Sequence, residues 1–177
     1  RLWSNESVHI VTNGSDSRFD VDAIGTLPAS LTTFLAIQKT NPKIVISAGT
    51  CGGFIARDGF IGEIILAERC VFHDRRIPLE GFMKYGIGDF SVANLHAIAE
   101  RLGFRVGTVS TGDSLDSQPY DLDFMNSVNA VAKDMEAAAV AWACALNEVP
   151  FTALKVTTDL VDGEITTEEE FITNLQY

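Results

Sequence analysis

Residues 151–163 read FTALKVTTDLVDG, an apolar run that stops on an aspartate. Residues 151–156 follow Pro150 and are apolar or β-branched over the length of a strand, so they predict a β-strand. Asp159 lies at the carboxyl end of this strand, where open α/β sheets bind their ligands. A carboxyl group there is partly desolvated, so it can hold a proton near neutral pH and give it to a leaving group. In this segment alone, an aspartate that caps the next turn or helix is the more common case.

Strand and helix patterns alternate along the rest of the chain. Residues 43–48 (KIVISA) are nearly uniformly apolar, as expected for a central parallel strand covered on both faces. The alternation predicts an α/β fold with a mainly parallel central sheet flanked by helices, in a single domain over residues 1–177. The expected strands are 8–12, 43–48, 63–72, 104–110, 128–132 and 151–156, and the expected helices are 27–39, 91–102 and 135–147.

The composition excludes several classes of partner. The 177 residues are 46% hydrophobic and carry a formal net charge of −11. This charge argues against binding to nucleic-acid backbones or anionic membrane surfaces, whereas a neutral or cationic small molecule is compatible with it. No apolar run reaches the ~18 residues of a membrane span. Cys51, Cys70 and Cys144 lack metal-ligand spacing, so we expect buried free thiols, a reducing cytoplasmic setting and no metal or cofactor.

The two ends of the sequence indicate a piece of a longer protein. Arg1 stands where an initiator methionine would be, and residues 171–177 have the pattern of the front half of an amphipathic helix. We therefore expect a fragment, a processed chain or a truncated one.

Two further motifs could bind a small molecule. Residues 47–54 (SAGTCGGF) directly follow an expected strand, and their glycines let backbone N–H groups approach a ligand beside the Thr50 hydroxyl. Residues 133–141 (KDMEAAAVA) place Glu136 at the start of an alanine-rich helix, where an unpaired charge is costly to bury. A helix N-terminus or a pair of sugar hydroxyls would stabilise that charge. An ordinary glycine turn and an exposed first-turn glutamate remain the alternatives.

Two other segments carry weaker signals. Residues 110–117 (STGDSLDS) hold two aspartates that could bind a ligand or close Asx turns. His73 precedes Asp74, but no motif places a nucleophile beside them, which favours a structural histidine or a subunit-contact loop. Two carboxylates, a glycine-rich loop and Met135 at the ends of parallel strands together suit a site that holds a sugar and protonates a leaving base.

In these same residues the chain closely resembles the 5′-methylthioadenosine nucleosidases, especially the plant-type branch, within the nucleoside phosphorylase fold family. That resemblance implies a three-layer sandwich around a mainly parallel sheet. The matching motifs occur in order and with similar spacing: AGTCGGF at 48–54, VFHDRRIP at 71–78, STGDSLD at 110–116, KDME at 133–136 and TDLVDG at 158–163.

The resemblance implies hydrolysis of the N-glycosidic bond of 5′-methylthioadenosine to adenine and 5-methylthioribose. Asp159 would be the general acid to the purine, and Glu136 would bind the ribose hydroxyls with Met135 packed against the sugar. Thr50 would lie near the ribose and the attacking water, and Leu115 would flank the adenine. The implied substrate-binding set is completed by Gly52, Lys133 and Thr158.

A homodimer is also implied, because in the resembling family the loop over residues 77–85 comes from a second subunit and covers the thioalkyl group. That family orients its water with a glutamate just after the first strand, near the N-terminus. This sequence begins beyond that point, and Glu6 does not match it. The loop residues that would meet the thioalkyl group are Ile77, Pro78, Met83 and Tyr85.

Two alternatives stay open. A purine nucleoside phosphorylase would need cationic groups for phosphate, and the candidates are Arg57, Arg75 and Arg76 rather than any residue of the glycine-rich loop. The other alternative is a non-catalytic storage or nucleoside-binding relative on the same fold. Retention of both Asp159 and Glu136 argues against that second alternative, and the unmatched N-terminal glutamate argues for it.

Overall fold

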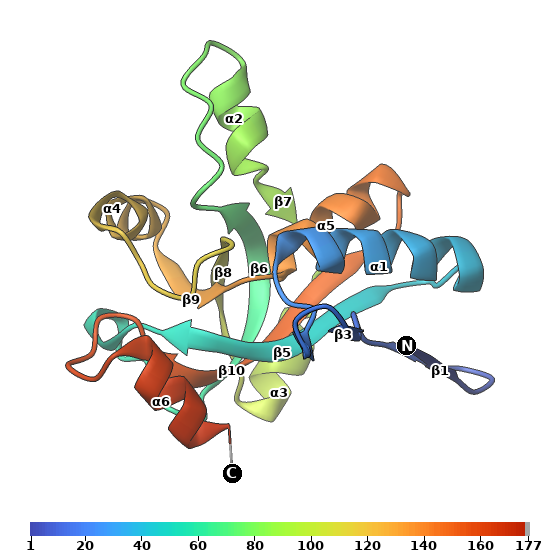
Figure 1. Ribbon diagram of the computed structural model, residues 1–177, viewed down its shortest axis with the longest axis horizontal. Helices are drawn as coiled ribbons and strands as arrows, with labels where there is room; N and C mark the ends of the chain where they lie inside the picture. The colour runs from blue at the N-terminus through green and yellow to red at the C-terminus, as the bar shows by residue number, and fades with distance from the viewer. Residues whose placement is uncertain (176–177) are drawn as a thin grey trace.

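A six-stranded sheet forms the centre of the structure (Figure 1). The computed structural model describes residues 1–175. The strands lie in the order β10-β5-β9-β8-β6-β7, and β10 also pairs with β6, which closes the sheet into a barrel-like ring. Their bounds are β5 (Val45–Gly53), β6 (Ile64–Phe72), β7 (Phe90–Ser91), β8 (Arg105–Thr111), β9 (Ala130–Asp134) and β10 (Phe151–Leu160).

The sheet is mixed, which corrects the expectation of a mainly parallel one. β5 runs parallel to β10, while β6, β8 and β9 run parallel to one another. The two groups meet antiparallel at β5–β9 and at β6–β10. The cause is the connection from β5 to β6, residues 54–63, which contains only the 3-10 turn η1 (Ile55–Arg57). A parallel return needs a crossover of about a dozen residues or more, usually through a helix, so the chain reverses direction here.

Helices pack around this ring. α1 and α5 lie side by side, and α5 also contacts β6, β8 and β10 (Figure 1). The first residues of α5 are alanines with almost no exposed surface, and their small side chains let the helix lie close to the sheet. α2 projects away from the sheet (Figure 1). The helices are α1 (Thr26–Thr40), α2 (Phe82–Ile87), α3 (His96–Leu102), α4 (Pro119–Ser127), α5 (Ala137–Leu146) and α6 (Thr167–Asn174).

Two short antiparallel hairpins precede α1. The first pairs β1 (Leu2–Ser4) with β2 (His9–Val11), and the second pairs β3 (Ser15–Asp16) with β4 (Val21–Asp22). β2 contacts α1, so the N-terminal segment is placed against the body of the fold. The strand expected at 8–12 is therefore confirmed.

The first half of β5 differs from the sequence expectation of a strand covered on both faces. Ile46 is 54% exposed, and Thr50 is exposed as well. β10 pairs with β5 along one edge from Val45 onward. Within residues 1–175, the other edge pairs with β9 only at Gly52. One face and one edge of this half of β5 are therefore open.

Two helical segments were also misjudged from sequence. The helix expected at 91–102 begins only at His96, because β7 occupies Phe90–Ser91 first. α4 has no counterpart among the expected helices. Its start is marked by a capping box in which Gln118 and Asp121 exchange hydrogen bonds around Pro119. Residues 171–177 were expected to be the front half of a helix, but α6 begins earlier, at Thr167, so residues 171–174 form its second half; residues 176–177 lie outside the described residues.

The three cysteines are free and buried, as expected. Burial raises the pKa of Cys51 and of Cys144 to about 12 each, so both stay as unreactive thiols. Within residues 1–175, no helix is both long and apolar enough to cross a bilayer. The same residues contain no group of three or more His, Cys, Asp or Glu side chains arranged to hold a metal ion.

Candidate active site

The carboxyl ends of four strands meet at one place in the ring. Gly52, near the end of β5, pairs with Lys133, near the end of the antiparallel β9. Asp159 is the partner of Gly52 on β10, and Asp134 is the partner of Thr111 where β8 and β9 end. The antiparallel contact between β5 and β9 therefore joins the ends of two parallel strand pairs. This geometry gathers the candidate residues of β5, β9 and β10 around Gly52.

Asp159 is buried, with 3% of its surface exposed, and its carboxylate lies beside Gly52. A Cβ atom on Gly52 would stand 2.6 Å from Asp159 Oδ2. Thr158 Oγ1 donates a hydrogen bond to Asp159 Oδ1 at 3.0 Å. Burial raises the pKa of Asp159, and the Thr158 hydroxyl and the Lys133 charge oppose that rise only in part. The Asp159 carboxyl group therefore keeps its proton to higher pH than a free aspartate, as a general acid requires.

Asp159 does not cap a turn or a helix in this structure. Among the described residues, no backbone N–H donates to its carboxylate, and the side chain of Asp162 performs that task instead. Asp162 accepts hydrogen bonds from the N–H groups of Ile55 and Ala56, at the start of η1, at 2.7 and 2.9 Å. The cap interpretation of Asp159 is therefore wrong.

Glu136 occupies the N-cap position of α5 and is partly buried. The backbone N–H of Gly25 donates to Glu136 Oε1 at 3.1 Å, and Lys155 Nζ lies 3.8 Å from Glu136 Oε2. Burial raises the pKa of Glu136, with a further rise from the Asp134 charge, while Lys155 and the Gly25 amide oppose it. Glu136 is thus a paired carboxylate rather than an exposed first-turn residue.

Lys155 is the centre of a buried charge cluster that the sequence interpretation missed. It is 2% exposed, and its Nζ lies 2.7 Å from Asp134 Oδ2. Burial alone would lower the pKa of Lys155, but Asp134 and Glu136 outweigh burial and raise it, so the ammonium group stays charged. Asp134 in turn accepts a hydrogen bond from Ala137 N at 2.8 Å, at the start of α5. The cluster fixes Glu136 through both the strand and the helix.

The Lys133 side chain forms hydrogen bonds within the protein. Its Nζ donates to the carbonyl oxygens of Ser114 at 2.8 Å and Leu115 at 2.7 Å. Burial lowers the pKa of Lys133, and nearby carboxylates, Asp159 first among them, oppose this. Lys133 therefore ties the loop after β8 to the end of β9, next to Asp159.

Thr50, Glu136 and Lys155 line one cavity of about 400 Å³, which lies between the open half of β5 and α1. Leu115 lines a second cavity, of about 500 Å³, together with residues that follow β10, such as Val161. Asp159 is not among the residues that line either cavity. The Asp159 carboxylate instead occupies the space where a side chain on Gly52 would lie. Gly52 is on β5, the strand that also carries Thr50, so Asp159 lies next to that strand.

The loop residues Ile77, Pro78, Met83 and Tyr85 lie apart from these two cavities. They belong to the projecting arm around α2 (Figure 1), where Met83 is 61% and Tyr85 56% exposed. None of the four lines the cavity of Thr50. Within one chain, the arm therefore does not complete the candidate site.

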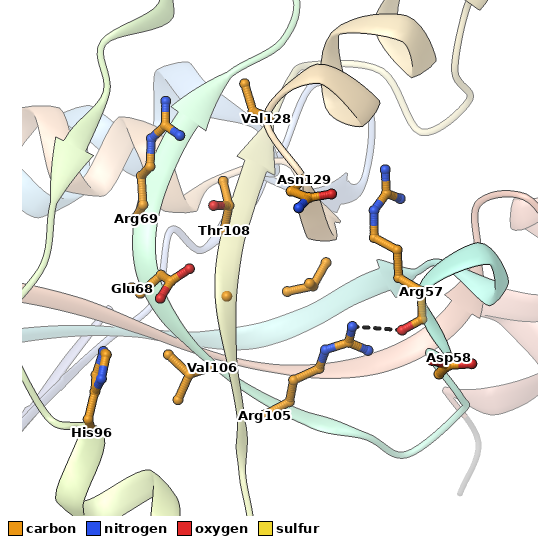
Figure 2. A pocket seen from close by; sticks show the side chains of 12 residues that line it. Arg57, Asp58, Glu68, Arg69, His96, Arg105, Val106, Thr108, Val128 and Asn129 are labelled. Carbon is orange, nitrogen blue, oxygen red and sulfur yellow. Dashed lines mark hydrogen bonds between the residues drawn. The ribbon is translucent and has the colours of Figure 1, made fainter.

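A larger cavity, of about 790 Å³, opens on the surface of β6 and β8 and contains three arginines (Figure 2). Arg105 donates to the carbonyl oxygen of Arg57 at 2.7 Å and lies 3.3 Å from Glu63, and Arg69 is paired with Asp89. The candidate residues at the strand ends are absent from its lining. Arg57 is held differently, with its guanidinium over the Phe54 ring and a hydrogen bond to Asn126 Oδ1 at 2.6 Å. We place the candidate site at the strand ends because the carboxylates of the sequence motifs gather there and not in this cavity.

The remaining polar motifs hold loops together. His73 is buried, and its Nδ1 lies 3.1 Å from Ser110 Oγ, as expected for a structural histidine. Asp74 accepts the backbone N–H of Asp113 at 2.7 Å. Asp113 in turn accepts the backbone N–H of Thr26 at 2.6 Å, at the start of α1. These bonds place the start of α1 beside Glu136.

Known proteins match this chain over nearly its whole length. The profile of the Phosphorylase superfamily matches residues 2–176. A 5′-methylthioadenosine nucleosidase of Arabidopsis thaliana is 46% identical over 171 residues, 95% of this chain and 63% of that protein. A 5′-methylthioadenosine/S-adenosylhomocysteine nucleosidase of the same plant is 39% identical over 174 residues, 98% of this chain and 68% of that protein.

The fold agrees with the sequence match. The apo structure of the Arabidopsis 5′-methylthioadenosine nucleosidase superimposes with a TM-score of 0.88 at 45% identity, over 90% of this chain and 66% of that one. This chain thus spans about two thirds of the length of these relatives. The expected nucleoside phosphorylase-like α/β fold is confirmed, with the mixed sheet as its correction. The chain therefore belongs to the Phosphorylase superfamily and, within it, to the family of the 5′-methylthioadenosine nucleosidases.

Proposed function

We propose that the protein hydrolyses the N-glycosidic bond of 5′-methylthioadenosine to adenine and 5-methylthioribose. One observation carries the proposal: the Asp159 carboxyl group, whose pKa is raised by burial, lies two strands away from a Glu136 carboxylate paired with Lys155. The names of the two Arabidopsis relatives support the choice of substrate.

Asp159 acts as the general acid in this proposal. Breaking the bond between the sugar and the purine moves the bonding electron pair onto a poor leaving group and leaves an oxocarbenium-like sugar. Asp159 donates its proton to the five-ring nitrogen of the purine as that bond breaks. The proton neutralises charge that develops only in the transition state, which is where an acid accelerates the reaction.

Glu136 binds the ribose hydroxyls on the other side of the bond. Its negative charge stabilises the developing positive charge of the sugar, and the Lys155 charge favours the ionised carboxylate and holds it in place. Thr50 lines the same cavity, so its hydroxyl is available to the ribose and to the attacking water. Met135, next to Glu136, packs against the sugar.

The adenine of the substrate lies near the loop after β8, which Lys133 holds through hydrogen bonds to the carbonyl oxygens of Ser114 and Leu115. Leu115 flanks the adenine from this loop, and the Lys133 bonds to its carbonyl oxygen keep it in position. Gly52 leaves the space that the acid occupies, because any side chain there would collide with Asp159. Thr158 orients the Asp159 carboxyl group through its hydroxyl.

Water, rather than phosphate, is the proposed nucleophile. Phosphate recognition needs free cationic groups. Arg57, Arg75 and Arg76 each place the guanidinium over an aromatic ring elsewhere, and the cavity of Thr50 has no arginine in its lining among residues 1–175. The cation that it does contain, Lys155, is held by two carboxylates.

The proposal extends to a cytoplasmic homodimer. The arm around α2 exposes large apolar side chains that a second copy could cover, namely Leu79, Phe82, Met83 and Tyr85. In such a dimer the arm of one subunit reaches the thioalkyl group bound by the other. Analytical ultracentrifugation of wild type and of Met83→Glu tests this. Wild type should sediment as a dimer and the variant should shift toward monomer, whereas a wild type that sediments as a monomer contradicts the homodimer.

A coupled adenine-release assay on the full-length gene product tests the proposed reaction. We expect equal rates with and without phosphate, and free 5-methylthioribose as the sugar product. A rate that requires phosphate, together with a sugar 1-phosphate product, would assign the protein to the phosphorylases. Tight nucleoside binding without adenine release would assign it to non-catalytic relatives.

A further inference from the structure

β10 contains a β-bulge directly before Asp159. The register between β5 and β10 shifts between Thr157 and Asp159, so Thr158 is an extra residue opposite β5. Such a bulge leaves backbone groups without ladder partners and turns the neighbouring side chain. The groups concerned are the Thr158 carbonyl and the Leu160 N–H, which flank Asp159 on both sides.

α6 supplies the partners of both groups. Asn174 Nδ2 donates to the Thr158 carbonyl oxygen at 2.8 Å, and the Leu160 N–H donates to Glu170 Oε2 at 2.7 Å. Glu170 and Asn174 are four residues apart, so they lie on one face of the helix. The helix therefore holds the backbone immediately before and immediately after Asp159.

We propose that α6 is a positioning element for the general acid, in which Glu170 and Asn174 fix the direction of the Asp159 carboxyl group by binding the bulge around it. This inference rests on the proposed role of Asp159. Glu170 and Asn174 line neither the Thr50 cavity nor the Leu115 cavity and bind the backbone beside Asp159, so they are positioning residues. A side chain on an unrestrained bulge would sample several directions, and a misplacement of about 1 Å can cost roughly 10²-fold in rate.

Glu170 adds an electrostatic contribution to this hold. Within residues 1–175, the charged groups that act on Asp159 are Lys133 on β9 and Glu170 on α6, and the Asp159 charge acts in turn on the Cys51 thiol on β5. Burial is the main cause of the raised pKa of Asp159, the Lys133 charge opposes it, and the Glu170 carboxylate raises it further. α6 thus both aims the acid and favours its protonated form.

The test separates the charge of Glu170 from its hydrogen bond in the full-length protein. Glu170→Gln keeps an acceptor for the Leu160 N–H but removes the charge, so the alkaline limb of the kcat–pH profile should move to lower pH. Glu170→Ala removes both, so it should show the same move, a roughly 2- to 10-fold lower kcat at little change in KM, and faster hydrogen exchange at Leu160. Asn174→Ala should lower kcat without moving the profile.

Glu169→Gln is the matched control, because it makes the same charge change on the same helix and its carboxylate has no hydrogen bond or ion pair within residues 1–175. Profiles of the Glu170 variants that overlay wild type, or a control that shifts as far as Glu170→Gln, overturn the inference. Unchanged exchange at Leu160 in Glu170→Ala overturns it whatever the activity. Absence of adenine release by wild type overturns the proposed function instead.

Discussion

Gly52→Ala places one methyl group against the proposed acid. The added Cβ would stand 2.6 Å from Asp159 Oδ2 and 2.7 Å from Val161 Cγ2, whereas ordinary contacts begin at 3.4 Å. The Asp159 carboxyl group must therefore move by about 0.8 Å, and a misplacement of that order costs about 10²-fold in turnover. Overpacking should also lower the free energy of unfolding by about 1–3 kcal/mol.

Gly107→Ala provides the matched control away from the site. Its Cβ would stand 2.5 Å from Val131 Cγ2, so the packing strain is similar but does not reach Asp159. We expect both variants to lower Tm, by about 2–4 °C per kcal/mol for a chain of this size, and only Gly52→Ala to lose adenine release. A folded Gly52→Ala with near wild-type kcat, or an equal loss of kcat in Gly107→Ala, would refute the reasoning.

Three further predictions follow from the charges of the site. Glu136→Gln should weaken transition-state binding of ribosides by about 1–3 kcal/mol, and a 2′,3′-dideoxy substrate should show little difference between wild type and variant; equal losses on both would remove Glu136 from the sugar. kcat should fall as pH rises through the raised pKa of Asp159, because only the protonated acid donates, and a profile unaffected by alkaline pH contradicts this. Lys155→Met should lower the free energy of unfolding by about 3–5 kcal/mol at neutral pH, because Asp134 is left buried without its cation. That loss should shrink as pH falls and the carboxylates take up protons, and chemical denaturation at two pH values measures it.

The places of the two carboxylates were predictable from sequence because local pattern determines them. The strand ends were not, since β5 continues to Gly53 and β10 to Leu160, and the expected glycine-rich loop at 47–54 is mostly strand. The aspartate after residues 151–156 and the glutamate before the alanine-rich helix both lie where the sequence places them. Burial of an apolar strand and of an alanine-rich helix is a property of those segments themselves. Asp159 is therefore buried with its strand, and Glu136 is partly buried at the start of its helix.

The direction of the strands was not predictable in the same way. Alternating strands and helices suggested parallel neighbours, but direction depends on each connection, and the short η1 connection reverses the chain between β5 and β6. The resulting contact of Gly52 with Lys133 joins strands that are distant in sequence. No local pattern encodes that contact.

Lys155 shows what the sequence could indicate about the buried charge cluster and what it could not. A lysine inside an otherwise apolar strand is costly to bury, so its presence already demands a carboxylate partner. Which carboxylates serve is set by the register of β10 and by the start of α5, where Asp134 and Glu136 converge. The sequence also did not indicate that Glu170 and Asn174 bind the backbone around Asp159, because the bulge exists only in the pairing of β10 with β5.

The central claim is that Asp159 gives a proton to the leaving purine, and Asp159→Asn in the full-length protein tests it most directly. The amide keeps the shape of the side chain but has no acidic proton to donate. Adenine release should fall by roughly 10²–10⁴-fold, while binding of a non-hydrolysable substrate analogue should change far less. Near-normal turnover by the folded Asp159→Asn protein would contradict the account.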